Sequence, residues 1–454
     1  MGKPATTDTR EIIVEILLDL EKGQDFSHKL IKAVLDKYDY LDSRDKAFIK
    51  RVTEGTIERQ LELDYYLDRF SNMETVVEKL DYYLNRFSSV PVRKMKPLIR
   101  CLLRMSTYQI LYMDAVPDSA VCNEACKLAA KRGFRTLKGF VNAVLRSIAR
   151  SKDNMPMPDS ADPVKYFSVK YSMPEWIVNL WLPVYGMEGT ETLLMGLLKI
   201  HPVSLRFCLE LSEAEREDLK KQIEARGVHL SAHKELPYVY LAENLENVSE
   251  LPGFAEGKFT VQDASSALAV KAAKINPGDF VMDLCAAPGG KTILAAEYTK
   301  EAGHVLSRDV SEYKTDLIHE NLERMHRTNV EVEVHDATVY DAEREASADV
   351  VLMDVPCSGL GVMGKKRDIK YHVTPESLKS IQELQRQIVE AGWRYVKPGG
   401  VLLYSTCTIN REENQNMAAW IMEQFPFVLE EERQLLPGTD ETDGFYFARL
   451  RRRT

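Results

Sequence analysis

The chain has 454 residues, of which 44% are apolar and 28% are charged, and its formal net charge is −9. This length is enough for two or three domains, and the composition is that of an ordinary globular protein. The sequence lacks an apolar run of about 18 residues, so we predict no membrane-spanning helix. Its N-terminus also lacks the apolar stretch of a signal peptide. We therefore expect a cytoplasmic protein that does not bind membranes.

Basic residues are concentrated in one segment of this acidic chain. Residues 91–150 contain twelve Lys and Arg against three Asp and Glu, a local balance of +9, whereas residues 1–90 carry −4 and residues 151–454 carry −14. The net negative charge argues weakly against a general nucleic-acid binder. The basic segment is nevertheless a candidate phosphate-contact surface. A solvated helical face is the alternative interpretation.

Residues 8–150 are predicted to be helical throughout. Apolar residues recur at helical spacing near both ends of this region, at Ile13, Ile16, Leu17 and Leu20 and again at Val141, Leu145 and Ile148. The segment LDYYLDRFS at 63–71 returns as LDYYLNRFS at 80–88, with a period of 17 residues. Two copies are too few for a solenoid, so we interpret the repeat as a local duplication.

The polar, Pro-rich stretch DNMPMPDSADP predicts a linker after the helical region. From residue 251 short apolar strands alternate with amphipathic helices, which predicts a mostly parallel, doubly wound, Rossmann-like α/β sheet. The expected strands are 280–284, 304–307, 330–334, 349–354 and 401–405, and the expected helices include 311–326 and 376–396. The expected domains are an all-helical domain at 1–150, a linker at 151–165, a small mixed α/β subdomain at 166–250 and a catalytic α/β domain at 251–454.

The segment VMDLCAAPGGKT at 281–292 predicts a cofactor site at the end of the first of these strands. Its glycines allow backbone N–H groups to approach a ligand at a helix N-terminus. Asp309 ends the next strand and can accept hydrogen bonds from both hydroxyls of a ribose, and Asp336 follows the third strand and can hold an adenine amino group. Together these residues predict an adenosine site.

A phosphate-binding nucleotide hydrolase is the competing interpretation of the same turn. CAAPGGKT differs from the phosphate-loop pattern only at the first position, where Cys285 replaces Gly, and DVVLMD mimics the acidic strand that holds magnesium. In the phosphate-loop pattern, the first glycine makes the tight turn of the phosphate cradle, and this chain lacks that glycine. Asp309 and Asp336 also have no task in that scheme.

Two further loops each place a cysteine after a strand, Cys357 in DVPCSGLG and Cys407 in STCT. Carbon 5 of cytosine is a poor nucleophile, but a thiolate added at carbon 6 creates an enamine whose carbon 5 can attack a sulfonium methyl group. This chemistry requires one nucleophilic cysteine, a second polar group for product release, and a group such as Asp354 at the N3/N4 edge of the base. Core packing is the alternative for any single buried cysteine.

Residues 261–450 resemble the Sun-type family of RNA 5-cytosine methyltransferases. The matching stretches are VQDASSALA (261–269), DLCAAPGGK (283–291), DVPCSGLG (354–361), KPGGVLLYSTCT (397–408) and DGFYFARL (443–450). The resemblance implies S-adenosyl-L-methionine as cofactor, Cys407 as nucleophile, and Cys357 as the residue that assists product release. It implies a cofactor site lined by Cys285, Ala286, Ala287, Pro288, Gly289, Gly290, Lys291, Asp309, Asp336 and Asp354. Lys291 is also implied to face the reacting base.

Residues 8–150 resemble the all-helical NusB-type RNA-binding domain, especially in CNEACKLAAKRG (122–133) and FVNAVLRSIAR (140–150). The fusion is typical of bacterial enzymes that methylate a cytosine of 16S ribosomal RNA. The chain departs from the family pattern at Cys208, where Asn is usual, and at Arg367 and Tyr371, where Pro and Trp are common. These departures affect RNA contact and leave the catalytic set unchanged.

We therefore expect an enzyme that acts on free or partly assembled 16S ribosomal RNA, because the target base must be unstacked to reach Cys407. We also expect the enzyme to be a monomer. Lys365, Lys366, Arg367 and Lys370 are expected to hold the RNA strand near the catalytic site. Transfer RNA or another ribosomal RNA site is the alternative substrate, and a non-catalytic RNA-binding factor is the alternative class. Cys122 and Cys126 stand four apart without a second ligand pair, so we expect core packing and no metal.

Overall fold

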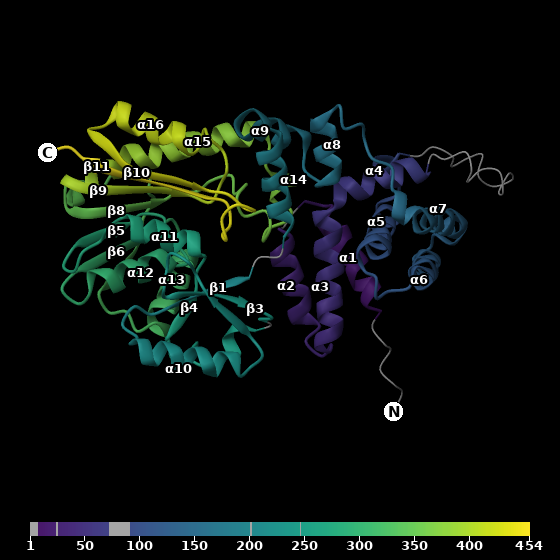
Figure 1. Ribbon diagram of the computed structural model, residues 1–454, viewed down its shortest axis with the longest axis horizontal. Coiled ribbons are helices and arrows are strands. Elements are labelled where there is room, and N and C mark those ends of the chain that lie inside the picture. The colour runs from purple at the N-terminus through teal and green to yellow at the C-terminus, as the bar shows by residue number, and fades with distance from the viewer. Residues whose placement is uncertain (1–7, 24–25, 72–90, 200–201, 246) are drawn as a thin grey trace. The chain divides into compact units, whose positions relative to one another are not determined.

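The computed structural model describes residues 8–23, 26–71, 91–199, 202–245 and 247–454 (Figure 1). The chain forms two compact units. The first consists of Met1–Leu194 and Lys365–His372, and the second of Met195–Gly364 and Val373–Thr454. None of the helices in the described ranges combines the length and apolarity that crossing a membrane requires.

The first unit is all-helical, which confirms the predicted helical N-terminal region. Its helices are α1 (Thr9–Leu20), α2 (Ser27–Lys37), α3 (Ser43–Glu58), α4 (Gln60–Ser71), α5 (Pro97–Tyr112), α6 (Asp118–Lys131), α7 (Lys138–Ser151), α8 (Pro163–Lys170), α14 (Ile369–His372) and the first part of α9 (Glu175–Leu198). The first copy of the duplicated segment ends α4. The second copy, 80–88, lies outside the described residues.

The helices of this unit pack through the apolar faces that the periodicity predicted. Ile13 on α1 and Val141 and Ile148 on α7 are fully buried, and α5 is buried along most of its length. Cys122 and Cys126 are buried in the same core. Both thiols therefore serve packing, as expected.

The segment 365–372 belongs to the helical unit, although it follows the Cys357 loop in the chain. Arg367 pairs with the carboxylates of Glu54 and Glu58 on α3. The buried ammonium of Lys370 donates hydrogen bonds to the carbonyls of Glu58 at 2.7 Å and Ser172 at 2.6 Å. The expectation that Arg367 and Lys370 hold RNA is therefore wrong. Both side chains instead bind carboxylates or carbonyls of the first unit.

The second unit contains a small antiparallel sheet with the strand order β2-β3-β1-β4. Its strands are β1 (Val203–Phe207), β2 (His229–Ala232), β3 (Val239–Glu243) and β4 (Phe259–Val261). Helix α10 (Glu213–Glu224) begins with a capping box between Ser212 and Glu215. Cys208 directly follows β1, and its thiol donates to the carbonyl of Gly257 at 3.0 Å.

The large sheet of the second unit has seven strands in the order β10-β11-β9-β8-β5-β6-β7. Its strands are β5 (Phe280–Asp283), β6 (His304–Asp309), β7 (Val330–Val334), β8 (Ala348–Asp354), β9 (Val396–Thr406), β10 (Phe427–Leu435) and β11 (Phe445–Arg452). The five strands from β5 to β9 pair in parallel, which confirms the predicted mostly parallel sheet. Strands β10 and β11 add an antiparallel edge.

Both faces of the large sheet are buried, because successive side chains of its strands enter different cores. Val350 and Leu352 of β8 pack in one core with α11 (Ala264–Ala272) and α12 (Gly290–Thr299). Val351 and Met353 pack in the other core, with α15 (Pro375–Gly392) and α16 (Gln415–Gln424). Helix α13 (Glu312–Arg324) lies beside α12 through Ile318 and Ile293. The sheet is therefore doubly wound, as predicted.

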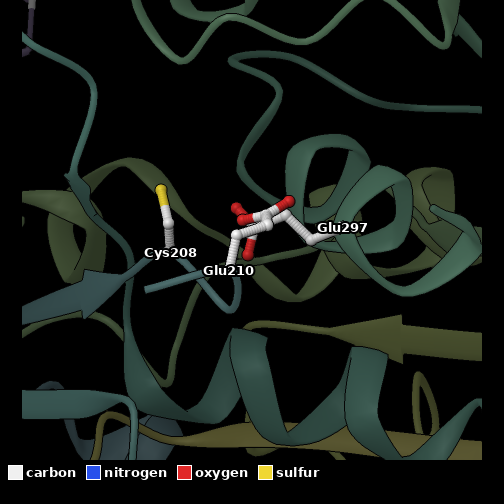
Figure 2. Close-up of side chains that lie close together, drawn as sticks. All are labelled: Cys208, Glu210 and Glu297. Atoms are coloured by element: carbon white, nitrogen blue, oxygen red, sulfur yellow. The ribbon is translucent and has the colours of Figure 1, made fainter. Parts of the chain in front are cut away.

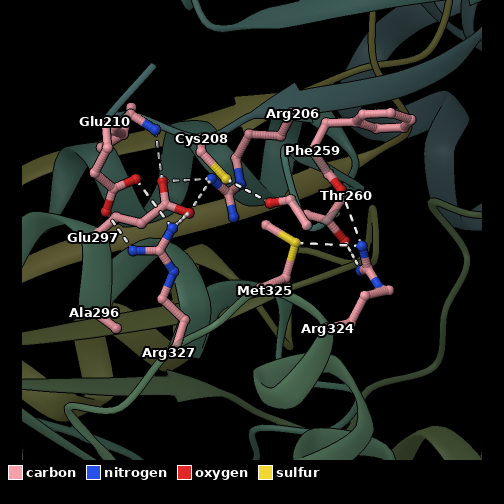
Figure 3. Close-up of polar contacts among 12 residues, drawn as sticks. Arg206, Cys208, Glu210, Phe259, Thr260, Ala296, Glu297, Arg324, Met325 and Arg327 are labelled. Atoms are coloured by element: carbon pink, nitrogen blue, oxygen red, sulfur yellow. Dashed lines mark hydrogen bonds and ion pairs between the residues drawn. The ribbon is translucent and has the colours of Figure 1, made fainter. Parts of the chain in front are cut away.

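A buried ion pair connects the small sheet to α12 (Figure 3). Arg206 on β1 and Glu297 on α12 have fully buried side chains, and Arg206 Nη1 donates to both carboxylate oxygens of Glu297 at 2.9 and 2.8 Å. Glu297 also accepts from the backbone N–H of Leu209 at 3.0 Å. Each charge compensates the burial of the other, so removal of one would leave an unpaired buried ion.

We predict that Glu297→Ala lowers the free energy of unfolding by about 3–5 kcal/mol, because the guanidinium of Arg206 loses its buried partner. Chemical denaturation followed by circular dichroism measures this change. Glu301→Ala is the matched control, since Glu301 is exposed just beyond the same helix, and it should change stability by less than about 0.5 kcal/mol. Equal effects of the two substitutions would contradict the prediction.

Candidate active site

Four loops meet at the carboxyl edge of the parallel strands. These loops follow β5, β6, β8 and β9. Each loop begins at, or directly next to, a residue that the sequence predicted to be functional. Because β5, β6, β8 and β9 run in parallel, Asp309 at the end of β6 and Cys407 after β9 lie at the same edge of the sheet. Ligands of open α/β sheets bind at this edge.

The turn from Cys285 to Gly290 connects β5 to α12. Gly289 is the N-cap residue and has a φ of 99°, a left-handed conformation that glycine adopts without steric cost. A Cβ at this position would also approach Ile318 to 3.3 Å. The glycine that the sequence singled out is therefore required by the backbone geometry of the turn.

Asp309 holds this turn from the neighbouring strand. Its Oδ2 accepts from the backbone N–H of Ala287 at 2.9 Å. Its Oδ1 accepts from the backbone N–H of Val310 at 2.8 Å and from the ammonium of Lys314 at 2.9 Å. Asp309 is buried, and its hydrogen bonds fix the carboxylate in position beside the turn.

Two features of this edge suit a polar ligand such as S-adenosylmethionine. No side chain among the described residues caps the N-terminus of α12, so its first N–H groups remain available to a carboxylate. Asp283 at the end of β5 is fully buried, and its Oδ1 lacks a partner within the described part of the chain. Burial raises the pKa of Asp283 to about 7. The residues present therefore fit the cofactor.

Asp336 lies in the loop after β7. Its Oδ1 accepts from the backbone N–H of Thr338 at 2.9 Å and from the Thr338 hydroxyl at 2.8 Å, and these hydrogen bonds lower the pKa of Asp336. The side chain is exposed and carries its negative charge at neutral pH. The neighbouring backbone is tied to β6, because His335 N–H donates to the carbonyl of Asp309 at 2.9 Å.

Lys291 and Asp354 form an ion pair between α12 and the end of β8. The ammonium of Lys291 lies 2.6 Å from Asp354 Oδ2, and Ser405 donates to Asp354 Oδ1 at 2.8 Å. Burial lowers the pKa of Lys291, but the Asp354 carboxylate outweighs burial and the net pKa is raised. The ammonium also lies 5.4 Å from the ring centre of Phe445. A fixed positive charge therefore stands at this edge.

The two cysteines of the strand-end loops are in direct contact. Cys357 Sγ and Cys407 Sγ lie 3.3 Å apart, within hydrogen-bond distance for sulfur. The hydrogen bond with Cys407 and burial raise the pKa of Cys357 well above its ordinary value. Cys357 thus holds its proton and can donate it to Cys407. Burial also raises the pKa of Cys285, so that thiol remains protonated.

The structure adds three residues that the sequence analysis did not single out. Asp283 precedes the cofactor turn, Phe445 covers Lys291, and Glu413 is buried in the loop that follows Cys407, where it accepts from the Cys357 loop. Asp283 begins the motif DLCAAPGGK, but the sequence does not reveal that its carboxyl group is buried. Glu413 belongs to the charged run NREEN, which in a sequence reads as a solvated loop, so no pattern distinguishes it from its exposed neighbour Glu412.

A second cluster lies away from this edge, where Cys208, Glu210 and Glu297 bring three potential metal ligands within 4.8 Å of one another (Figure 2). It lines a cavity of about 1320 Å³ near the amino ends of β6 and β7. Arg206 and Arg327 already pair with the carboxylates, and burial raises the pKa of Cys208 to about 11. A metal would require the thiolate and would displace these cations, so we assign no metal to this cluster.

Comparisons with known proteins agree with this architecture. Residues 270–451 match the family model 16S rRNA methyltransferase RsmB/F, and residues 7–78 and 73–150 match the NusB family. The Bacillus subtilis (strain 168) protein named "Probable ribosomal RNA small subunit methyltransferase B" is 33% identical over 476 residues, covering 98% of this chain and 99% of the relative. The Salmonella typhi protein named ribosomal RNA small subunit methyltransferase B is 30% identical, covering 95% of this chain and 96% of the relative.

Solved structures show the same fold. The crystal structure of PH0851 has a TM-score of 0.77 at 24% identity, covering 99% of this chain and all of the other. The fold and its carboxyl-edge site thus define a Rossmann-like methyltransferase. The chain belongs to the family of ribosomal RNA small subunit methyltransferase B. Membership confirms S-adenosylmethionine as the cofactor and excludes the nucleotide hydrolase that the turn alone left open.

We predict that Asp309→Ala weakens binding of S-adenosylhomocysteine at least about 10-fold, because the carboxylate that holds the cofactor turn in place is removed. Isothermal titration without magnesium measures the affinity. Asp316→Ala, an exposed change on the adjacent helix α13, should leave it unchanged. Retention of wild-type affinity by Asp309→Ala would refute this location of the cofactor.

Proposed function

We propose that this enzyme transfers the methyl group of S-adenosylmethionine to carbon 5 of a cytosine in 16S ribosomal RNA through a covalent bond between Cys407 and carbon 6. The observation that supports this most strongly is the pair of thiols 3.3 Å apart beside the Lys291–Asp354 ion pair. The family of the chain supports ribosomal RNA as the substrate. A covalent C5 mechanism requires one nucleophilic thiol and a second polar group for product release, and this pair can supply both.

Cys407 is the proposed nucleophile. It is partly exposed in the loop that opens from β9, and Cys357 can donate a hydrogen bond to its sulfur. The positive charge of Lys291 and this hydrogen bond both favour a thiolate at Cys407. Addition of the thiolate to carbon 6 makes carbon 5 nucleophilic. S-adenosylmethionine, when bound, supplies the electrophilic methyl group.

Asp354 and Lys291 are proposed to bind the polar edge of the cytosine. Asp354 is anchored by Ser405, so its carboxyl group is held at the end of β8 beside the ammonium of Lys291. A base with a donor amino group and an acceptor ring nitrogen fits this pairing of acceptor and donor. Orientation of carbon 6 toward Cys407 follows from fixing the opposite edge of the ring.

Cys357 is proposed to assist product release. After methyl transfer, carbon 5 must lose its proton before the Cys407–carbon 6 bond breaks. Formation of that bond consumes the Cys407 thiolate, so the hydrogen bond that raises the pKa of Cys357 is lost at this stage. Cys357 can then exchange a proton with the adduct more readily than in the resting enzyme.

The helical domain is proposed to bind RNA phosphates through the basic segment 91–150. Several of its cations are already paired: Arg100 and Arg104 with Glu21, and Lys131 with Glu11. The cations that form no ion pair within the described residues are Arg93, Lys94, Lys96, Arg135, Lys138, Arg146 and Arg150. These residues are the proposed phosphate contacts.

We predict that Cys407→Ala reduces turnover by at least about a thousandfold, since the nucleophile is lost, while the affinity for S-adenosylhomocysteine stays within twofold. Cys357→Ala should instead accumulate a covalent protein–RNA complex, visible as a slowly migrating band on a denaturing gel. The double substitution is the control and should give no band. A band from Cys407→Ala but not from Cys357→Ala would reverse the two roles.

Bisulfite sequencing of RNA from a strain lacking the enzyme identifies the substrate. We expect one cytosine of 16S ribosomal RNA to lose its protection and to regain it when the gene is restored. Loss of protection in transfer RNA, with ribosomal RNA unchanged, would replace the proposed substrate by the alternative one.

We predict that the combined change of Arg135, Lys138 and Arg146 to Ala weakens RNA binding and reduces its salt dependence. Each lost phosphate contact should lower the slope of log affinity against log salt by about 0.7–0.9. Filter binding from low to moderate salt measures the slope. Lys127→Ala is the control, since Lys127 is already paired with Glu124. An unchanged slope in the triple variant would place the RNA elsewhere.

A further inference from the structure

We propose that Glu413 is a positioning residue that holds the two cysteine loops at the separation their shared chemistry requires. The inference rests on the proposed function and assigns a role to a side chain that does not contact the substrate. It is carried by the hydrogen bonds of one buried carboxylate.

Glu413 lies in the loop between β9 and α16 and is fully buried. Within the described parts of the chain, its two carboxylate oxygens accept four hydrogen bonds, and all four donors are neutral groups. Ser358 Oγ at 2.6 Å and Asn410 Nδ2 at 2.9 Å donate to Oε1. Ser358 N–H at 2.9 Å and Gln385 Nε2 at 3.0 Å donate to Oε2. The carboxylate thus bridges three segments of the chain.

The bridged segments include both cysteine loops. Ser358 directly follows Cys357, so its two hydrogen bonds fix the backbone and side chain next to the thiol. Asn410 stands three residues after Cys407 in the second loop. A single carboxylate therefore connects the residues that determine where both sulfur atoms lie.

Further hydrogen bonds near Glu413 also hold the two cysteine loops together. Gln385 on α15 also donates to the carbonyl of Pro356 at 2.9 Å, so the residues on both sides of Cys357 are held. The hydroxyls of Ser358 and Thr408 lie 2.7 Å apart, and Gly361 N–H donates to the carbonyl of Cys407 at 3.1 Å. These bonds join the two loops around the sulfur pair.

Burial of a carboxylate without a cation is costly, even when hydrogen bonds compensate much of the lost hydration. A glutamine would avoid the charge, but in either orientation its NH₂ group would face an N–H donor, from Asn410 on one side or from Ser358 and Gln385 on the other. The four donors thus select a carboxylate here. A buried carboxylate whose oxygens all accept hydrogen bonds is expected where precise positioning of the chain matters more than stability.

The charge of Glu413 also acts on Cys357. The hydrogen bond with Cys407 and burial are the largest causes of the raised pKa of Cys357, and the negative carboxylate of Glu413 raises this pKa further. This effect favours the proton on Cys357 and leaves Cys407 as the member of the pair that reacts. The position and the charge of Glu413 therefore support the same division of roles.

Glu413→Gln and Glu413→Asp test the proposal, with Glu412→Gln as the matched control at the exposed neighbouring position. Glu413→Gln should lower kcat for RNA methylation by about 100-fold, because a small displacement of a reacting group is sufficient for such a loss. The KM for S-adenosylmethionine should stay within twofold. Glu413→Asp keeps the charge but cannot reach both loops, so it should restore kcat only partly.

A measurement that needs no RNA reports the sulfur separation directly. Diamide takes up the two thiol hydrogen atoms as a disulfide forms between Cys357 and Cys407, and peptide mapping by mass spectrometry follows the product. We expect rapid cross-linking in the wild type and in Glu412→Gln, slowing at least about 10-fold in Glu413→Gln, and no such product in Cys357→Ser. Circular dichroism melting confirms that the variants are folded at the assay temperature.

Wild-type kcat and cross-linking rate in Glu413→Gln would overturn the proposal. A parallel loss of kcat, cofactor affinity and folded protein would also overturn it, since Glu413 would then only stabilise the fold. Slow cross-linking in Glu413→Gln together with a Cys357→Ala variant that forms no RNA adduct would leave the positioning intact and refute the proposed covalent function.

Discussion

The parallel pairing of β5, β6, β8 and β9 is the constraint on which this active site depends. Parallel strands deliver their carboxyl ends to one edge, so residues as distant in sequence as Asp283 and Cys407 become neighbours of a single site. The pairing persists because both faces of the sheet are buried under helices, α11 and α12 on one face and α15 and α16 on the other. The cofactor turn, the ion pair and the thiol pair are consequences of this arrangement.

The site combines charges that are individually expensive to bury. Lys291 stays protonated because Asp354 outweighs the effect of burial, and one buried oxygen of Asp283 has no hydrogen-bond partner among the residues that the structure describes. Glu413 is satisfied only by neutral donors. In contrast, Arg206 and Glu297 form a buried ion pair that serves the structure away from the site. Buried polar groups with incomplete compensation therefore occur at the edge where chemistry is proposed.

Much of this fold was predictable from the sequence, because strands buried on both faces and amphipathic helices leave clear patterns. The five parallel strands, the cofactor turn and the two cysteine loops were all found in this way. The antiparallel strands β10 and β11 were both missed. In β10, FVLEEERQL exposes charged residues along an edge and lacks the pattern of a buried strand. Arg367 and Lys370 were misjudged because a cluster of basic residues does not reveal that its partners are carboxylates and carbonyls of the helical unit. Glu413 was missed because sequence shows the charge and not its burial.

The central claim is that the sulfur of Cys407 bonds to a cytosine ring beside the methyl donor. RNA that carries 5-fluorocytosine at the target position tests it most directly, since fluorine at carbon 5 cannot leave as a proton does and the adduct persists after methyl transfer. Peptide mapping by mass spectrometry should find the methylated nucleotide attached to the peptide that contains Cys407. Attachment to the Cys357 peptide, or a methylated product without any covalent complex, would contradict the account.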